Sequence, residues 1–283
     1  MIIFKNSADI RKWHEVQHKK PGKIGFVPTM GALHIGHLSL IESSKSKNQA
    51  TVCSIFVNPT QFNDGKDFVK YPVTLEKDIS MLETAGCDVL FLPSVKEIYP
   101  IGLKKSRNYE LGYLETILEG KFRPGHFQGV CDVVQRLLDI VQPHNLYLGQ
   151  KDYQQCMVIT RLIEILKKDK KINISICPTL RENDGLAMSS RNMRLTEQDR
   201  KTAGTIYKSL QLVKEKIQPD NLVELQLEAR SMLENAGFKV DYFEIVASKD
   251  LSQLTKWDGK QKLVAIVAAF INEVRLIDNL ILN

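Results

Sequence analysis

The sequence has no apolar run as long as the roughly 18 residues that a transmembrane helix needs. Its start, Met1-Ile-Ile-Phe-Lys5, turns polar too soon to form the apolar core of a signal peptide. The five cysteines are an odd number without a Cys-x-x-Cys pair, which disfavours a disulfide framework and a zinc site. Repeats and low-complexity segments are also missing. We therefore expect a cytoplasmic globular protein with no membrane partner, in which the cysteines are small buried hydrophobic residues.

The sequence also has little excess of one charge over the other, because the formal net charge is only +6 in 283 residues. The run at 167–171, Lys-Lys-Asp-Lys-Lys, is basic enough to suggest nucleic-acid binding, but no aromatic residues alternate with its lysines. We interpret the run as a solvated helix end and expect no nucleic-acid partner. A mildly positive protein still suits small anionic substrates.

Short apolar runs alternate with helical patterns through the first 178 residues. The connections between the runs are too long for hairpins, which favours an α/β fold with a parallel, doubly wound, Rossmann-like sheet. The expected strands cover 24–28, 51–57, 88–92, 145–148 and 172–176, and the expected helices cover 6–19, 37–48, 75–86, 127–141 and 153–168.

A smaller α+β domain, predicted to act as a lid, is expected at residues 179–283, so that the first domain covers residues 1–178. Thr196 is followed by an acidic first turn and is expected to cap a helix, and Gly237 is expected to close a later one. Strands are expected at 240–247, 263–270 and 273–282, with the last two paired antiparallel through Ile271-Asn272.

The most informative segment is His34-Ile-Gly-His37, which lies where the expected strand at 24–28 gives way to a helix. Amides at such a turn and the positive end of the helix dipole bind anions, and Gly36 lets a base or ribose lie directly on the backbone. The two histidines face the same side and can donate together to a developing phosphate charge. A chance pair is the plain alternative, but the position after a strand favours a functional role.

Three further segments place polar side chains after expected strands. Asn58 and Gln61 follow the second strand, where their amides can recognise hydroxyls and a carboxylate. Lys151 follows the fourth strand as a mobile point charge, and Gln155 lies one helical turn later on the same side. The loop at 184–192 combines small residues, hydroxyls and one arginine, and such a loop can close over a polyphosphate.

Together, in this order, the four segments resemble the pantothenate synthetase family of the nucleotidyltransferase superfamily, which includes class I aminoacyl-tRNA synthetases. The first segment is similar to the HIGH motif of that superfamily, and Met188-Ser-Ser-Arg191 resembles its second signature. Arg123-Pro-Gly-His126-Phe matches a further family stretch. The resemblance is dense from about residue 20 to 200 and weaker beyond. Relatives usually carry arginine in place of Gln128 and glutamate in place of Gln150, and these departures leave the local charge balance open.

The resemblance implies a reaction in two steps. The carboxylate of pantoate attacks the α-phosphorus of ATP to give a pantoyl adenylate and pyrophosphate, and β-alanine then attacks the acyl carbon to give pantothenate and AMP. Magnesium is expected to arrive with ATP, without a separate metal site in the protein. Asp78 is either a contact of that ion or a solvated helix residue. The family also leads us to expect a homodimer.

The resemblance further implies roles for single residues. His37 is expected to act as an acid with His34 beside it, and Lys151 to bridge phosphate oxygens. Gln61 and Gln155, with Asn58 next to them, are expected to bind pantoate and β-alanine. The ATP site is expected to comprise Met30, Gly31, Ala32, Leu33, His34, Ile35, Gly36, His37, Gly149, Gln150, Lys151, Asp152, Leu180, Met188, Ser189, Ser190 and Arg191.

Two alternatives stay open. The first is another adenylyl-transferring enzyme of the superfamily, either a tRNA synthetase-like protein or a cofactor adenylyltransferase. The lack of a basic, aromatic-rich surface or anticodon-binding appendage disfavours the former, and the three amides disfavour the latter. The second is a nucleotide-binding regulator that has lost its chemistry, which would bind ATP without exchanging pyrophosphate. The intact histidines, lysine and loop disfavour that alternative.

Overall fold

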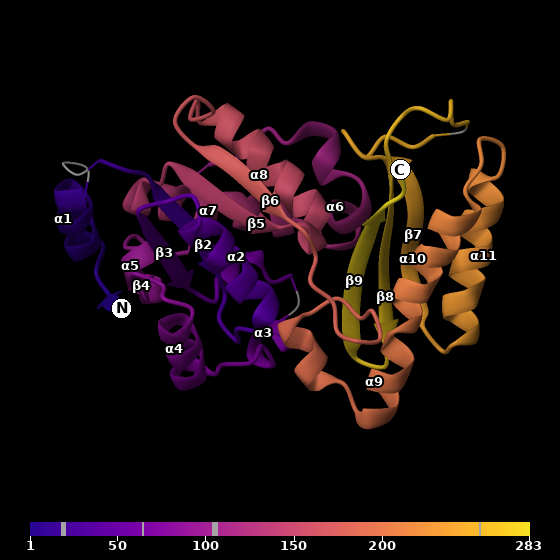
Figure 1. Ribbon diagram of the computed structural model, residues 1–283, viewed down its shortest axis with the longest axis horizontal. Helices are drawn as coiled ribbons and strands as arrows, with labels where there is room; N and C mark the ends of the chain where they lie inside the picture. Colours follow the sequence, from indigo (N-terminus) through magenta and orange to yellow (C-terminus); the bar gives the residue numbers. More distant parts are fainter. Residues whose placement is uncertain (18–20, 64, 104–106, 255) are drawn as a thin grey trace. The chain divides into compact units, whose positions relative to one another are not determined.

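The computed structural model describes residues 1–17, 21–63, 65–103, 107–254 and 256–283. The chain forms two compact units (Figure 1). Unit 1 comprises residues 1–149 and 155–178, and unit 2 comprises residues 150–154 and 179–283. Residues 150–154, expected in the first domain, cluster in the structure with the second unit.

Unit 1 is built on a six-stranded parallel sheet with the strand order β1-β4-β3-β2-β5-β6. The order reverses between the neighbours β2 and β5, so the sheet is doubly wound, which confirms the predicted fold class. The strands are β1 (Ile2–Phe4), β2 (Ile24–Thr29), β3 (Ala50–Ile55), β4 (Val89–Phe91), β5 (Asn145–Gly149) and β6 (Asn173–Cys177).

Successive strand residues of unit 1 enter two separate cores, because side chains alternate across a sheet. Phe26 belongs to a core shared with helices α1, α7 and α8, whereas Val27 belongs to a core shared with α2 and α4. Helices therefore bury both faces of the sheet, and its strands read as continuous apolar runs. The helices are α1 (Ser7–Gln17), α2 (Ile35–Lys45), α4 (Leu75–Thr84), α7 (His126–Val141) and α8 (Tyr153–Ile165).

The element bounds differ from the predicted ones by a few residues. The helix expected at 6–19 ends at Gln17, and residues 18 and 19 lie outside the described part of the chain. The strand expected at 51–57 ends at Ile55, and a short helix begins at Pro59. Strand β1 was not predicted. The shorter elements are η1 (Pro59–Gln61), α3 (Gly65–Val69), α5 (Val95–Ile98), η2 (Gly112–Glu115), α6 (Leu118–Phe122), η3 (Gln150–Asp152) and η4 (Ser190–Arg194).

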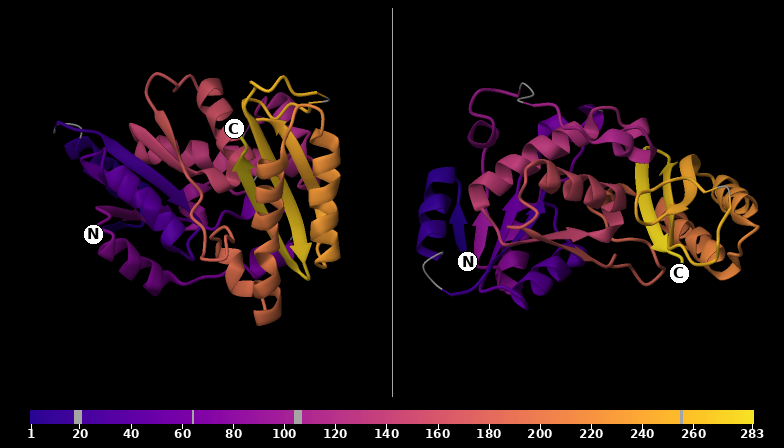
Figure 2. Two further views of the ribbon diagram at one scale, coloured as in Figure 1. Left: turned by 45° about the vertical axis from the view of Figure 1, so that its right-hand side comes forward. Right: turned by 90° about the horizontal axis from the view of Figure 1, so that it is seen from above.

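Unit 2 contains a three-stranded antiparallel sheet in the order β7-β8-β9, with α10 and α11 packed on one of its faces (Figure 2). Strands β8 and β9 form the predicted antiparallel hairpin, and its turn lies at residues 272–273, one residue later than the expected Ile271-Asn272. Thr196 caps α9 by accepting from the backbone N–H of Asp199, and Gly237, at φ 89°, follows the end of α11. The elements are α9 (Glu197–Ala203), α10 (Thr205–Lys216), α11 (Leu222–Asn235), β7 (Lys239–Ala247), β8 (Leu263–Ile271) and β9 (Val274–Ile281).

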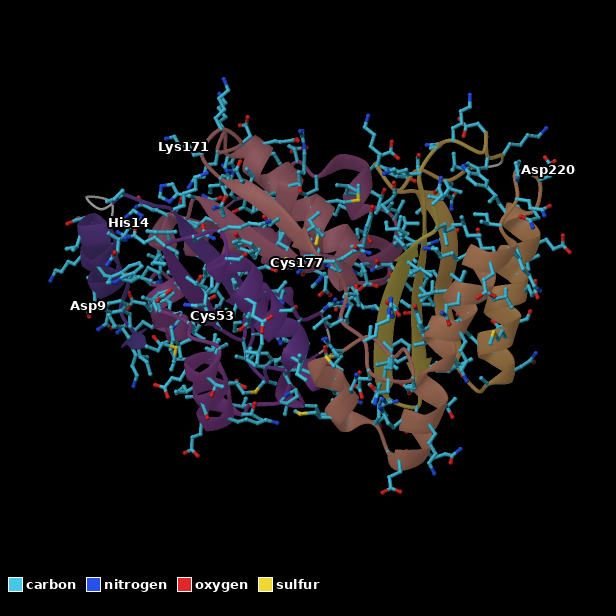
Figure 3. The ribbon with its side chains drawn as sticks, viewed as in Figure 1. Asp9, His14, Cys53, Lys171, Cys177 and Asp220 are labelled. Atoms are coloured by element: carbon cyan, nitrogen blue, oxygen red, sulfur yellow. The ribbon has the colours of Figure 1, made fainter. Side chains whose placement is uncertain are left out.

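The five cysteines all lie in unit 1 and are buried and free, as expected; Figure 3 labels Cys53 and Cys177. Burial raises the pKa of Cys87 to about 11 and that of Cys131 to about 12, so these thiols are neutral near pH 7.

Among the helices that the structure describes, none has the length and apolar character required to cross a membrane.

Candidate functional site

The predicted strand-to-helix turn is present between β2 and α2. Strand β2 ends at Thr29 and α2 begins at Ile35, so that His34 is the N-cap residue. Gly31 and Ala32 both take left-handed backbone conformations, at φ 83° and 50°. A Cβ atom on Gly31 would lie only 3.0 Å from a methyl carbon of Ile55. The loop is therefore a tight, locally strained turn that only the surrounding contacts can maintain.

The structure brings the two histidines of this turn together. The ring centroids of His34 and His37 are 4.0 Å apart, with an angle of 40° between the ring planes. The backbone N–H of His34 donates to Nδ1 of His37 over 3.3 Å. Because Nδ1 is the acceptor, a neutral His37 carries its proton on Nε2. His37 is thus oriented as a donor through Nε2.

Asp78, in the first turn of α4, supports the same loop. Its side chain is 1% exposed, so the interpretation as a solvated helix residue was wrong. Its two carboxylate oxygens accept from the backbone N–H groups of Ala32 and Leu33 at 2.9 and 2.8 Å. The hydroxyl of Thr74 donates to Oδ1 at 2.9 Å. These three donors replace the water that the carboxylate loses, which offsets the free-energy cost of burying it.

The amides that follow β3 lie on and beside η1. Asn58 is 1% exposed, and its Nδ2 donates to Gln61 Oε1 at 3.2 Å and to the Gly129 carbonyl at 3.1 Å. Asn58 Oδ1 accepts from the Tyr99 hydroxyl at 2.8 Å. Gln61 is half-buried, with Nε2 3.0 Å from the sulfur of Met30. Asn58 therefore orients Gln61 with hydrogen bonds that all stay within the protein.

The stretch from Arg123 to Gly129 packs against this amide turn, a role that the sequence analysis did not assign. The ring Nδ1 of His126 lies 2.7 Å from the carbonyl oxygen of Gln61. A Cβ atom on Gly129 would lie 2.3 Å from the carbonyl oxygen of Thr60, so only glycine lets α7 approach η1 so closely. Sequence spacing gives no sign of this contact, because the two segments lie 65 residues apart.

The segment after β5 carries Lys151. Its side chain is 17% exposed, and its Nζ lies 3.7 Å from Asp152 Oδ1. The carbonyl oxygens of Gln150 and Lys151 both accept from Asn279 of β9, a residue that the sequence analysis missed. Gln155 is half-buried in the first turn of α8, inside the helix expected at 153–168, and its position on the same side as Lys151 stays a prediction.

The two departures from the family pattern have mainly neutral partners. Gln128 is buried, and its side-chain amide pairs with the backbone of Tyr109. Its Oε1 accepts from the Tyr109 N–H and its Nε2 donates to the Tyr109 carbonyl, at 2.9 Å each. Its Nε2 also donates to Glu115. Gln150 donates to the side-chain oxygen of Asn279 at 3.3 Å. Gln128 therefore uses both the donor and the acceptor of its amide within the protein, and Gln150 uses the donor.

In unit 2, the loop that precedes α9 brings several of the predicted residues together. The backbone N–H of Met188 donates to the carbonyl of Leu180 at 3.0 Å. Ser189 caps η4, and its Oγ accepts from the backbone N–H of Arg191 at 3.3 Å. Ser190 follows as a buried residue. The hydroxyls and the guanidinium group thus sit on one short, capped turn.

Comparison with known proteins was consistent over the whole chain. A family model described as pantoate-beta-alanine ligase matches residues 2–281. The pantothenate synthetase of Cytophaga hutchinsonii is 43% identical over 285 residues, covering 100% of this chain and 99% of the relative. That of Bacteroides thetaiotaomicron is 44% identical over 259 residues, covering 91% and 90%.

Two solved structures are similar throughout. The pantothenate synthetase of Thermus thermophilus has a TM-score of 0.90 and 40% identity, and the match covers 99% of both chains. The pantoate-beta-alanine ligase of Francisella tularensis, solved in complex with beta-gamma ATP and beta-alanine, has a TM-score of 0.79 and 43% identity. That match covers 99% of this chain and 97% of the relative.

Proposed function

Because the chain belongs to the pantoate-beta-alanine ligase family, we propose that it joins pantoate to β-alanine through a pantoyl adenylate. It is an enzyme, a ligase of pantothenate synthesis. In the first step a carboxylate oxygen of pantoate bonds to the α-phosphorus of ATP, and pyrophosphate leaves. In the second step the amine of β-alanine bonds to the acyl carbon, loses a proton, and AMP leaves. The family match over residues 2–281 carries this conclusion and favours it over other adenylyl transfers.

For the first step, His37 acts as a donor to the phosphates, with His34 beside it. The proposal is supported by the contact that occupies Nδ1 of His37 and leaves the proton on Nε2. Adenylation needs charge stabilisation and alignment more than a strong base, so two imidazole donors and the ammonium group of Lys151 suit it. Ser189, Ser190 and Arg191 hold the β- and γ-phosphates as pyrophosphate departs.

For the acyl substrate, Gln61 and Gln155 bind the hydroxyls and the carboxylate of pantoate. Asn58 acts through Gln61, since its own amide is occupied by Gln61, Gly129 and Tyr99. The remaining ATP contacts come from backbone groups at 30–37 and 149–152, together with Leu180 and Met188. The Francisella relative binds beta-gamma ATP and beta-alanine, which supports the choice of nucleotide and amine.

Magnesium would enter with ATP and supply charge to the phosphates. In the part of the chain that the structure describes, no group of three or more His, Cys, Asp or Glu side chains is arranged to hold a metal ion. Asp78 is 1% exposed and both of its oxygens accept from the protein, so in this proposal its carboxylate holds the loop and does not serve as a main ligand of the ion. In this proposal the phosphates of ATP are the main ligands of the ion.

The proposal places the enzyme in the cytoplasm as a homodimer. Five free thiols suit a reducing compartment in which ATP is available. Light scattering during size-exclusion chromatography tests the assembly, because a homodimer has twice the mass of one chain.

Exchange of labelled pyrophosphate into ATP tests the proposed reaction. We expect exchange with magnesium, ATP and pantoate in the absence of β-alanine, and no exchange when pantoate is left out. Addition of β-alanine should release AMP and pantothenate. Formation of ADP and phosphate would contradict the adenylate, and exchange without pantoate would show that AMP is transferred to a group other than pantoate, which contradicts a pantoyl adenylate.

A further inference from the structure

Two adjacent polar residues are buried in the last strand of unit 2. Asp278 and Asn279 of β9 are 2% and 1% exposed, within a strand whose other residues are mostly apolar. Burying an amide or a carboxylate costs free energy unless protein groups replace the water that it loses. The partners of these two side chains therefore show what the pair does.

Asn279 holds the segment that carries Lys151. Its Nδ2 donates to the carbonyl oxygens of Gln150 and Lys151, at 3.0 and 2.9 Å. Its Oδ1 accepts from the side chain of Gln150 at 3.3 Å. One buried amide thus fixes two consecutive carbonyls, one on each side of the Lys151 α-carbon.

Asp278 and Arg181 hold Asn279 in turn. Arg181 meets both carboxylate oxygens of Asp278, at 2.5 and 3.1 Å, and also donates to the carbonyl of Asn279 at 3.1 Å. The guanidinium lies 4.0 Å above the ring of Tyr207 and donates to the carbonyl of Gly185. A bidentate pair of this kind fixes direction as well as distance. The backbone of β9 is therefore fixed at Asp278 and Asn279.

We propose that Asn279 is a positioning residue for Lys151, held in place by the Asp278–Arg181 pair. The inference rests on the proposed function, in which Lys151 contacts the phosphates of ATP. Lysine carries a point charge at the end of a four-carbon stem. The position of its α-carbon therefore sets the region that the ammonium group can reach, and a shift of that backbone moves the whole region. A misplacement of about 1 Å in a reacting or stabilising group can cost roughly 10²-fold in rate.

The test uses Asn279→Asp in the full-length chain. The substitution keeps the size of the side chain and replaces a donor by a carboxylate that faces two carbonyl oxygens. We expect the single-turnover rate of pyrophosphate formation, at saturating magnesium-ATP and pantoate, to fall about 10²-fold. Asn279→Ala, which adds no buried charge, is the second variant and should lower the rate in the same direction.

A double variant separates positioning from a merely structural role. If Asn279 acts through Lys151, Asn279→Asp should slow a Lys151→Ala enzyme by less than about threefold, since the group that it positions is already gone. If the two effects multiply, Asn279 works independently of Lys151 and the proposal is overturned.

Arg275→Gln is the matched control. Arg275 lies on the same strand and pairs with Asp241 at 2.8 Å, and both side chains are largely buried. We expect it to lower the thermal midpoint of unfolding while keeping the rate within about threefold of the parent. An equal loss of rate in this variant would show that any damage to β9 suffices, which overturns the proposal.

The outcomes separate this inference from the proposed function. A parent enzyme without pantoate-dependent exchange would refute the function, and Lys151→Ala at the parental rate would refute the role of Lys151. Suppose that the parent shows pantoate-dependent exchange and that Lys151→Ala is slow. If the folded Asn279 variants then react within about threefold of the parent, only the inference about Asn279 is wrong.

Discussion

Each unit contains one buried aspartate next to a segment proposed to bind ATP, and the two charges are compensated differently. In unit 1, Asp78 accepts from the backbone N–H groups of Ala32 and Leu33 and from a threonine hydroxyl. In unit 2, Asp278 faces a cation, Arg181. Burial raises the pKa of Asp278, and the hydrogen bonds from the Arg181 guanidinium oppose that rise.

The difference shows two ways of holding a functional segment. The donors to Asp78 face it only while Gly31 and Ala32 keep their left-handed conformations, so the carboxylate and the loop stabilise each other. The partner of Asp278 is a side chain, and the pair anchors a strand that then holds Lys151 through Asn279. Unit 1 thus fixes its loop by direct backbone contact, whereas unit 2 does so through a relay of side chains.

The largest expected effect is on the stability of unit 2. Asp278→Asn leaves the buried charge of Arg181 without its counter-ion, which should cost about 3 to 5 kcal/mol in the free energy of unfolding of unit 2. Asp78→Asn leaves no opposite charge behind and should cost unit 1 less, about 1 to 3 kcal/mol for poorly satisfied donors.

Urea unfolding with one tryptophan per unit measures both changes. Trp13 packs against the core of unit 1 and Trp257 against that of unit 2, so Trp13→Phe and Trp257→Phe leave single reporters. A larger decrease in the free energy of unfolding for Asp78→Asn than for Asp278→Asn would contradict the prediction that an unpaired Arg181 is the more costly defect.

The next effect concerns catalysis, with one residue from each unit. His37→Ala and Lys151→Ala should each lower the single-turnover rate of adenylation by about 10² to 10³-fold, as expected for the loss of one preorganised donor. Circular dichroism spectra should match the parent, because neither side chain belongs to a core. A rate within about threefold of the parent in either variant would refute that residue's assignment.

A smaller effect is expected in the acyl pocket. Gln61→Glu keeps the acceptor that Asn58 uses but replaces the Nε2 donor by a negative charge. Pantoate affinity should drop by about 2 to 3 kcal/mol and ATP affinity by less than about 1 kcal/mol, as for a charged partner left unmatched. Titration calorimetry measures both.

The control for Gln61→Glu is Gln226→Glu, which changes a half-buried amide of unit 2 that contacts Glu244 and the backbone of Ile245. It should leave both affinities unchanged. Equal losses for the two substrates in Gln61→Glu would make Gln61 a structural residue.

The sequence could predict the features of the site that are local in the chain. The turn at His34-Ile-Gly-His37 and the amides after β3 were located because strand periodicity and strand ends are local features of the chain. The partners of those residues are not local: Asp78 lies 46 residues from Ala32, and Asn279 lies 128 residues from Lys151. Residues 150–154, expected in the first domain, cluster with unit 2 for the same reason, since their contacts with β9 leave no pattern nearby.

One signal in the sequence could have revealed the relay. Asp278 and Asn279 are consecutive polar residues in a strand that is otherwise mostly apolar, and both are buried. In a strand with one buried face, two adjacent residues cannot both point to solvent, so at least one needs a partner inside the protein. The identity of that partner still required the structure.

The smallest expected effect concerns the loop of unit 2 that leads to Met188 and depends on pH. Hydrogen bonds from Arg200 hold the pKa of Asp184 below its usual value, and Asp184 also accepts from the backbone N–H of Leu186. A carboxyl group whose pKa is lowered by folding stabilises the folded state above its unfolded pKa, near 3.9, and loses that contribution as pH falls through the folded value. Because the pair is partly exposed, its contribution at neutral pH should be under about 1 kcal/mol.

Asp184→Asn should therefore lower the stability of unit 2, followed through Trp257, by that amount at pH 7. The gap between parent and variant should close as the pH falls below about 4. A gap that stays constant through the acid range would show that the charge of Asp184 does not hold the loop, whereas Trp13, the reporter of unit 1, should record no gap at either pH.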